Sequence, residues 1–390
     1  MGVSGQIFDV VVVGGGPVGL STAWNLARRG SRVVVLERHT FLNEVAGTSG
    51  AERHWRLQYT EEDLCRLTAA ALPLWRDLEA ATGRKLLHEV GSLWFGDVDV
   101  RTNEGQISGT ARMMDSQSIP YEWLTGKEIE RRYGFRDLPA HFEGFLQPDG
   151  GAADVRGTLA ALFALAQEHG AVLRDREPVV EVVPDDSGVT VRSAARTYRA
   201  QKVVLANGSY ANRLLEPLGL PLPMNVFEMA LVTLRQPDPS ISYPFWYVFQ
   251  PPTDEDTNLF YGFPPNPWAT GDEVRVGPVF EVDPLGPDQE PAGAPDPRHV
   301  ERVVSWVRDH LPHVVAEPVR TSSCLAVLPA DPGRQFFLGA ATGITGGENV
   351  VVSTGGWGFK FIPLLGEVCA DLCLDGATRH DISRLALPKT

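Results

Sequence analysis

The chain has 390 residues, 43% of them hydrophobic, and a formal net charge of −14. This hydrophobic content excludes a disordered chain, and the length allows one very large domain or two intertwined ones. The acidic charge argues against nucleic acid and anionic membranes as partners, because both bind basic surfaces. We see neither a membrane-spanning apolar run nor a cleaved signal, and therefore expect a cytoplasmic protein.

The first strand and helix of the chain enclose a glycine turn. Residues 8–13 are almost all apolar and mostly β-branched, which predicts a strand buried on both faces, and residues 20–29 predict a helix. Between them, Gly14, Gly16 and Gly19 have the G-x-G-x-x-G spacing. In a dinucleotide-binding fold these glycines allow the tight turn, the approach of a pyrophosphate and close helix–strand packing.

A second predicted strand, residues 32–36, ends in Glu37, eighteen residues after Gly19. A carboxylate at that position can accept hydrogen bonds from ribose hydroxyls. The alternative is a glycine turn in an α/β protein that binds no nucleotide. Because strand, helix and terminal glutamate are all present, we favour the dinucleotide site.

Between the glycine turn and the middle of the chain, the pattern changes from helix to strand to loop. A capping box at Thr60 predicts a helix that runs to Gly83, with a kink at Pro73. Residues 91–96 predict a strand, and the polar residues 97–110 predict a loop.

The rest of the chain alternates between the same two kinds of structure. Asp154 caps a predicted helix over residues 155–169. Residues 226–280 are rich in alternating and aromatic residues and predict an antiparallel sheet with one face lining a cavity. Further strands are predicted at 178–183, 189–192, 202–205, 320–328, 335–339 and 349–353, and further helices at 210–215, after Asp296-Pro297, and from Trp357 to about Leu374.

These elements predict an α/β protein built from a Rossmann-like nucleotide-binding domain and an inserted, antiparallel-sheet substrate domain of α+β type. We assign residues 1–84, 145–225 and 318–390 to the first domain, and residues 85–144 and 226–317 to the second.

Two arginines and one lysine attract attention as possible ligand-binding groups. Arg53 and Arg56 would share one face of a helical turn, and Arg56 lies between Trp55 and Leu57, where a guanidinium could hold a carboxylate. A surface ion pair with a nearby glutamate is the simpler interpretation, and the spacing alone favours it. Lys360 is the single charge in an apolar helix start, so it either reaches outward to solvent or faces an anion.

The remaining candidates are ambiguous from sequence alone. Trp357 follows two glycines and could stack on a flat ring or pack in a core. Arg275 alternates with two valines and faces either solvent or the cavity, and Glu104 is an ordinary loop carboxylate. Of the four cysteines, Cys369 and Cys373 are four residues apart on the predicted last helix, as expected for packing in a core. For Cys324 we also expect a buried, inert thiol. We find no disulfide framework, no paired metal-ligand spacing and no Ser-His-Asp order, so the chemistry must come largely from the dinucleotide.

Several blocks together resemble one family. The opening glycines, residues 203–208, Cys324 and residues 356–361 are similar to the monomeric sarcosine oxidase branch of the D-amino-acid-oxidase-like FAD oxidases. Within this branch, the blocks TSGAERHWRLQYT, GSLWFGD, NEGQISGT, EGFLQPDGG and DTNLFYGF resemble piperideine-2-carboxylate oxidases of nikkomycin biosynthesis, which form picolinate.

The resemblance implies FAD, joined through a thioether from Cys324 to the flavin 8-methyl carbon. It also implies which residues of this chain surround the cofactor: Gly14, Gly16, Pro17, Val18, Gly19, Glu37, Arg38, Thr48, Ser49, Arg53, Val179, Gly208, Cys324, Gly356, Gly358, Phe359 and Lys360.

The same resemblance implies that Arg56 and Lys360 hold a substrate carboxylate, that Trp357 lies along the flavin and that Glu104 and Tyr261 line the pocket. Arg275 replaces a lysine that promotes reaction with oxygen in sarcosine oxidases. Its guanidinium keeps the charge but is bulkier and cannot give up a proton. Val279 stands where the resemblance leads us to expect a polar residue, and a valine cannot relay a proton.

The implied activity is oxidation of piperideine-2-carboxylate, a cyclic imino acid, to picolinate, with O₂ reduced to H₂O₂. Because of Val279, an alternative stays open: a two-electron oxidase of an N-methyl or cyclic secondary amino acid such as sarcosine, pipecolate or proline. The partners implied are the small carboxylate substrate and O₂, and the resemblance implies a monomer.

Overall fold

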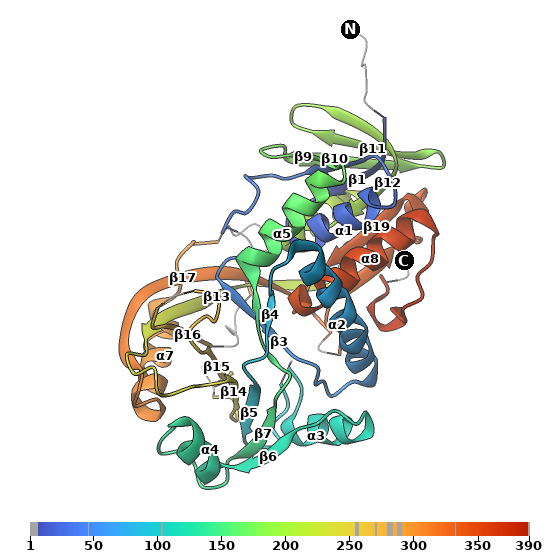
Figure 1. The fold of residues 1–390 in the computed structure, drawn as a ribbon. Helices are drawn as coiled ribbons and strands as arrows, with labels where there is room; N and C mark the ends of the chain where they lie inside the picture. The colour runs from blue at the N-terminus through green and yellow to red at the C-terminus, as the bar shows by residue number, and fades with distance from the viewer. Residues whose placement is uncertain are drawn as a thin grey trace.

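The computed structural model describes residues 7–45, 47–102, 104–253, 257–269, 271–278, 284–286, 291–331 and 333–388. Val279 lies outside the described residues. Two large sheets dominate the fold (Figure 1), and a small three-stranded sheet also forms. In the described part of the chain, no helix combines the length and apolar character needed to cross a membrane.

The first large sheet carries the glycine turn. Its central strand β1 pairs in parallel with β2 on one side and β12 on the other, and β2 and β12 pair in parallel with β9 and β19. Antiparallel strands β10, β11 and β18 complete the sheet. The strand bounds are β1 Ile7–Val13, β2 Val33–Leu36, β9 Val172–Arg174, β10 Val179–Asp185, β11 Gly188–Ser193, β12 Thr197–Leu205, β18 Phe337–Ala340 and β19 Val350–Thr354.

Both faces of β1 are buried, as its apolar sequence predicts. Val10 and Val12 belong to one hydrophobic core together with residues of the helices α1 (Pro17–Ala27), α5 (Val155–Glu168) and α8 (Ile362–Leu374). These three helices lie side by side on that face (Figure 1). Val11 and Val13 belong to a second core with β10, β11 and the short helix α6 (Asn212–Leu215). The glycine turn is therefore held by packing on two sides.

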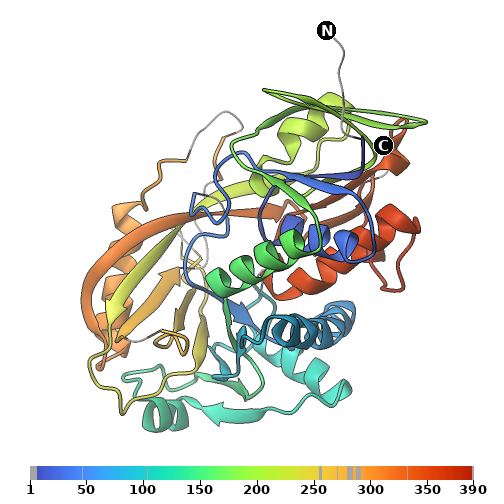
Figure 2. The same ribbon diagram turned by 45° about the horizontal axis from the view of Figure 1, so that its top comes forward.

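The second large sheet has the strand order β17-β13-β16-β15-β14-β5-β7-β6. All its pairs are antiparallel except β14 with β5, a parallel pair that the sequence analysis did not predict. The long strand β17 runs from this sheet toward the first one (Figure 2). The bounds are β5 Ser92–Gly96, β6 Glu122–Thr125, β7 Glu143–Gln147, β13 Met224–Arg235, β14 Phe245–Phe249, β15 Phe260–Phe263, β16 Glu273–Pro278 and β17 Val315–Pro329.

These two sheets confirm the predicted fold class of a Rossmann-like domain with an inserted sheet domain. The predicted domain boundaries stay a prediction, and β7, β13 and β17 each run across one of them. Helix α7 (Pro297–His310) begins after Asp296, as predicted. The Asp296 side chain caps the helix, which packs against β17 and β16.

The third sheet corrects the prediction of a helical turn at Arg53 and Arg56. Strands β3 (Glu52–Trp55) and β4 (Leu87–His88) both pair with β8 (Gly151–Asp154). Arg53 therefore lies on a strand, and Arg56 follows it. The strand forms because β8 supplies its hydrogen-bond partners, and that strand is some hundred residues away in sequence.

Three further local predictions are wrong. Helix α2 (Glu62–Thr82) begins after Glu61 without a capping box, because the Thr60 hydroxyl bonds instead to Thr110 Oγ1 and Gln106 N. Part of the predicted loop 97–110 belongs to helix α3 (Ile107–Ser116), and helix α4 (Gly126–Tyr133) follows. Before α8, residues 358–361 form a 3-10 turn, η4 (Gly358–Phe361), not the start of the helix.

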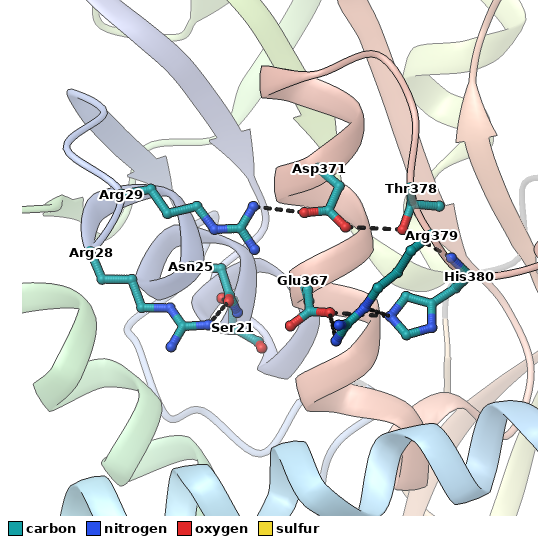
Figure 3. Close-up of polar contacts among 9 residues, drawn as sticks. All are labelled: Ser21, Asn25, Arg28, Arg29, Glu367, Asp371, Thr378, Arg379 and His380. Atoms are coloured by element: carbon teal, nitrogen blue, oxygen red, sulfur yellow. Dashed lines mark hydrogen bonds and ion pairs between the residues drawn. The ribbon is translucent and has the colours of Figure 1, made fainter.

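The chain after α8 folds back along that helix (Figure 3). Glu367 accepts hydrogen bonds from Arg379 Nη2 at 2.9 Å and contacts His380 Nε2 at 3.1 Å. Asp371 contacts Arg29 of the segment after α1 and the Thr378 hydroxyl. The Arg29 contact ties α8 to the C-terminal end of α1, and η4 leads directly into α8.

Candidate active site

A cavity of about 560 Å³ lies between the two large sheets. Its wall includes the glycine turn after β1, Cys324 on β17, and aromatic residues of β14 and β15. Among the residues predicted for the site, all but Gly19, Ser49 and Arg56 line this cavity. The fold therefore gathers residues from many separate stretches of the chain around one space.

The three motif glycines have different surroundings. Gly14 has φ of +102°, which side chains rarely adopt, and a Cβ there would collide with Ala206 O. A Cβ on Gly19 would collide with the Gly14 carbonyl oxygen. A Cβ on Gly16 would meet no protein atom within 4 Å and would project into the cavity. The backbone at Gly16 is thus open to a ligand, at the N-terminal end of α1, where free N–H groups and the helix dipole favour a phosphate.

Glu37 stands at the end of β2, where the sequence predicts a ribose-binding carboxylate. It is 8% exposed, and its two oxygens accept hydrogen bonds from Gly15 N at 2.7 Å and His39 N at 2.8 Å. The carboxylate therefore sits against the glycine turn. With the open space over Gly16, this arrangement fits the adenosine and pyrophosphate part of a dinucleotide.

Cys324 lies on β17 opposite Met229 of β13 and contributes to the cavity wall. It is partly exposed, so the default prediction of a buried thiol is wrong; Cys369 and Cys373 are buried, as expected. Ser49 Oγ bonds to the carbonyl of the neighbouring Ser323 at 3.3 Å. The sulfur atom is thus on the cavity side of a well-paired strand.

The simpler interpretation of both arginines, a surface ion pair, is wrong. Arg53 donates to the carbonyls of Glu52, Gly47 and Ser49 at 2.7–2.9 Å, and so holds the turn that carries Thr48. Burial lowers the pKa of Arg53.

Arg56 is fully buried and forms an ion pair with Glu104. Its guanidinium carbon lies 4.2 Å from the centre of the Tyr59 ring and 4.9 Å from that of Trp94. Burial opposes its charge, but the Glu104 carboxylate and the Tyr59 hydroxyl together outweigh burial and raise the pKa of Arg56. The Nε and Nη2 atoms have no hydrogen-bond partner among the described residues. These two atoms form one edge of the guanidinium, the edge that can bind a carboxylate with two parallel hydrogen bonds.

Lys360 on η4 lies on the cavity wall and does not reach outward to solvent. Its side chain is buried, and Nζ donates to Trp357 O at 3.1 Å and lies 5.9 Å from the centre of the Tyr59 ring. Burial and the nearby Arg56 charge lower the pKa of Lys360 to about 7. Arg56 and Lys360 therefore both lie near the Tyr59 ring, and a bound anion would stabilise both charges.

Arg275 on β16 also faces the cavity, while Val274 and Val276 pack in a separate core. Of the two orientations that the sequence left open, Arg275 therefore has the one toward the cavity, and the valines on the other side of the strand are buried as well. Arg275 Nε lies 2.7 Å from Glu52 Oε1, and Nη2 donates to Glu52 O at 2.9 Å. Burial disfavours the charge, but Glu52, Tyr261 and Cys324 together outweigh burial and raise the pKa of Arg275.

The aromatic part of the wall includes Trp357 and Tyr261, as predicted, together with Phe245 and Tyr247. Burial raises the pKa of Tyr261, so its hydroxyl stays protonated. His54, Phe245 and Tyr247 were missed by the sequence analysis. The only signal for His54 is its place between Arg53 and Arg56.

Comparison with known proteins assigns the class. The family model described as "FAD dependent oxidoreductase" (DAO) matches residues 9–372, so the chain belongs to this family. The protein is an FAD-dependent oxidoreductase with a D-amino-acid-oxidase-like fold.

Among solved structures, the chain is similar to the open form of NikD, described as an unusual amino acid oxidase essential for nikkomycin biosynthesis. The two share 63% identity with a TM-score of 0.95, over 99% of this chain and 98% of that one. Human peroxisomal sarcosine oxidase is 27% identical over 97% of this chain and 95% of its own length. A bifunctional amine oxidase of Dictyostelium discoideum is 30% identical over 97% of this chain, which spans 37% of that longer protein.

The glycine geometry gives a testable prediction. In Gly16→Ala the new methyl group enters only the cavity, so we expect the melting temperature of the flavin-free protein to be unchanged. We expect the FAD affinity to fall roughly ten-fold, the equivalent of about 1.4 kcal/mol. Flavin absorbance per protein and thermal melting measure the two effects. In the control Gly19→Ala the methyl group strikes the Gly14 carbonyl, so the fold itself should lose stability. A Gly16→Ala protein with wild-type flavin affinity would contradict the prediction.

Proposed function

We propose that the protein is a covalent FAD oxidase that converts piperideine-2-carboxylate into picolinate, with O₂ as electron acceptor. The observation that carries this proposal is the full-length similarity to NikD at 63% identity, and the buried cations Arg56 and Lys360 support it. Lys360 on the cavity wall, Arg56 buried beyond that wall and the aromatic side chains suit a flat ring with a carboxylate.

In this proposal Arg56 and Lys360 hold the substrate carboxylate. Lys360 lies on the wall and makes the first contact. Arg56 lies beyond the wall, and Glu104 pairs with its Nη1 atom, so only the Nε and Nη2 edge is left for a carboxylate. Charge-assisted contacts of about 1.5–3 kcal/mol each suffice to orient a small ring. The two cations also lower the pKa of a substrate nitrogen and so favour its neutral form.

FAD, when bound, supplies the acceptor for two electrons in each oxidation round. The glycine turn, Glu37 and Cys324 would hold the cofactor, with Cys324 as the covalent attachment point. Arg275 would take the place of the oxygen-promoting lysine. Because Glu52 pairs with Arg275, the electrostatic field of the Arg275 charge in the cavity is weaker than that of an unpaired cation.

A second candidate is a two-electron oxidase of an N-methyl or cyclic secondary amino acid. Val279 and the similarity to sarcosine oxidases favour it. The predictions of a monomer and of a cytoplasmic location stay predictions.

The product of the reaction separates the two candidates. We expect the purified protein to consume piperideine-2-carboxylate and O₂ and to accumulate a product with the ultraviolet absorption band of picolinate, because four electrons must be removed to reach the aromatic ring. Peroxide should form in two equivalents per ring. With sarcosine, pipecolate and proline as comparison substrates, peroxide without an aromatic product would instead support the second candidate.

The covalent bond has its own test. After acid precipitation we expect the yellow colour to stay with the protein pellet in the wild type and to move to the supernatant in Cys324→Ala. Cys65→Ala is the matched control, because Cys65 is buried away from the cavity and should leave the colour in the pellet. Wild-type flavin that is fully released by acid would show that no thioether forms.

The pKa of Lys360 predicts how anion binding depends on pH. A folded-state pKa of about 7 means that the ammonium is present below that pH and is lost as the pH rises. Benzoate stays ionised between about pH 6 and 9, so its dissociation constant should rise toward ten-fold per pH unit above the lysine pKa. Lys360→Met should bind benzoate weakly at every pH. Lys127→Met, at an exposed site on α4, is the control and should behave like the wild type. A flat profile in the wild type would contradict the prediction.

A further inference from the structure

A histidine that the proposed function does not use lies on the cavity wall. His54 of β3 stacks on Phe245, with ring centroids 3.6 Å apart and an interplanar angle of 12°. Its Nε2 atom lies 2.8 Å from Ser92 Oγ, and Gln58 Nε2 donates to the same oxygen at 2.8 Å. Ser92 and Gln58 are both fully buried. Stacking on Phe245 therefore fixes one face of the imidazole, and the hydrogen bond to Ser92 fixes its Nε2 end.

With the Gln58 amide oriented as the structure has it, this hydrogen-bond chain places the imidazole proton on one ring nitrogen. The Gln58 amide nitrogen can only donate, so Ser92 Oγ accepts from it. Within the described residues, His54 Nε2 is the other side-chain atom bonded to Ser92 Oγ, so the serine hydroxyl donates to it. The hydrogen of a neutral imidazole then resides on Nδ1. Burial, followed by the charges of Arg56 and Lys360, lowers the pKa of His54 well below its usual value, so the ring stays neutral.

The second nitrogen is free to bind a ligand. Nδ1 has no hydrogen-bond partner in the part of the chain that the structure describes, and His54 shares the cavity wall with Lys360. Among the polar groups here, Arg56 and Lys360 are cations suited to a carboxylate, and Glu104 is paired with Arg56. A neutral N–H donor beside two cations is suited to a ligand that has an uncharged nitrogen next to a carboxylate: the nitrogen accepts from the N–H group, and the cations bind the carboxylate.

We propose that His54 is a substrate-binding residue whose Nδ1–H donates to the ring nitrogen of a heterocycle carrying a carboxylate on the adjacent carbon. This inference rests on the proposed function, because it takes the carboxylate to lie at Arg56 and Lys360. His54 and Arg56 are two residues apart, which corresponds to roughly 6.6 Å along an extended chain. A ligand whose nitrogen and carboxylate are neighbours can reach both. His54 thus selects for the nitrogen, whereas the cations select for the acid.

Picolinate and benzoate test this role directly, because they differ only in a ring nitrogen against a C–H group. Calorimetric titration of the flavin-loaded wild type at neutral pH should show tighter binding of picolinate. His54→Phe keeps a ring on Phe245 but has no donor. It should weaken picolinate roughly 3- to 10-fold, the range of one neutral hydrogen bond, and leave benzoate unchanged. His54→Gln, which restores an N–H donor, should recover part of the loss.

A matched control and a relay variant complete the experiment. His88 on β4 pairs with the same Ala152 of β8 as His54 does but lies outside the cavity wall, so His88→Phe should change neither affinity. Ser92→Ala removes the group that fixes the tautomer and should weaken picolinate selectively, by less than His54→Phe.

The outcomes separate this inference from the proposed function. A wild type that forms picolinate, with a His54→Phe variant that keeps the wild-type ratio of picolinate to benzoate affinity, overturns the role of His54 alone. If His54→Phe does not fold, unchanged ratios in both His54→Gln and Ser92→Ala overturn it equally. A wild type that prefers picolinate to benzoate but does not oxidise piperideine-2-carboxylate overturns the proposed function and leaves the binding role of His54 standing.

Discussion

The charge of Arg56 is the constraint on which the substrate end of the cavity depends. A guanidinium without any exposed surface carries a desolvation cost of several kcal/mol, and a paired carboxylate with good hydrogen bonds must offset it. Glu104 supplies one such contact, and the Tyr59 and Trp94 rings add cation–π contacts. Because the Nε and Nη2 edge is still without a partner, the charge is only partly compensated in the protein alone. A bound carboxylate would complete the compensation, so burial itself makes this region an anion site.

The parts that the sequence could predict are those whose cause is local. The glycine turn follows from three residues within one strand–helix connection, and the caps at Asp154 and Asp296 act within one helical turn. The fold class was predictable because the alternation of β-branched and amphipathic segments is itself a fold signature.

The parts that the sequence could not predict depend on distant partners. The segment with Arg53 and His54 is a strand only because β8 pairs with it, and no feature within the segment announces that partner. Thr60 has a capping sequence, yet its hydroxyl bonds to Thr110 across the fold. The burial of Arg56 likewise depends on a glutamate 48 residues away. The resemblance to a family pointed to Arg56 and Glu104, but spacing alone favoured a surface ion pair for Arg56.

The charges that meet at this end of the cavity run against the charge of the chain as a whole. The chain carries −14. Among the described residues, however, Arg53, Arg56, Arg275 and Lys360 gather here with the two carboxylates of Glu52 and Glu104. Glu52 pairs with Arg275 and Glu104 pairs with Arg56, whereas Arg53 and Lys360 have no carboxylate partner among the described residues. Arg53 uses its hydrogens on backbone carbonyls. Lys360 is therefore the cation whose charge the protein compensates least. Its pKa is lowered for this reason, and an anionic ligand would supply the missing negative charge.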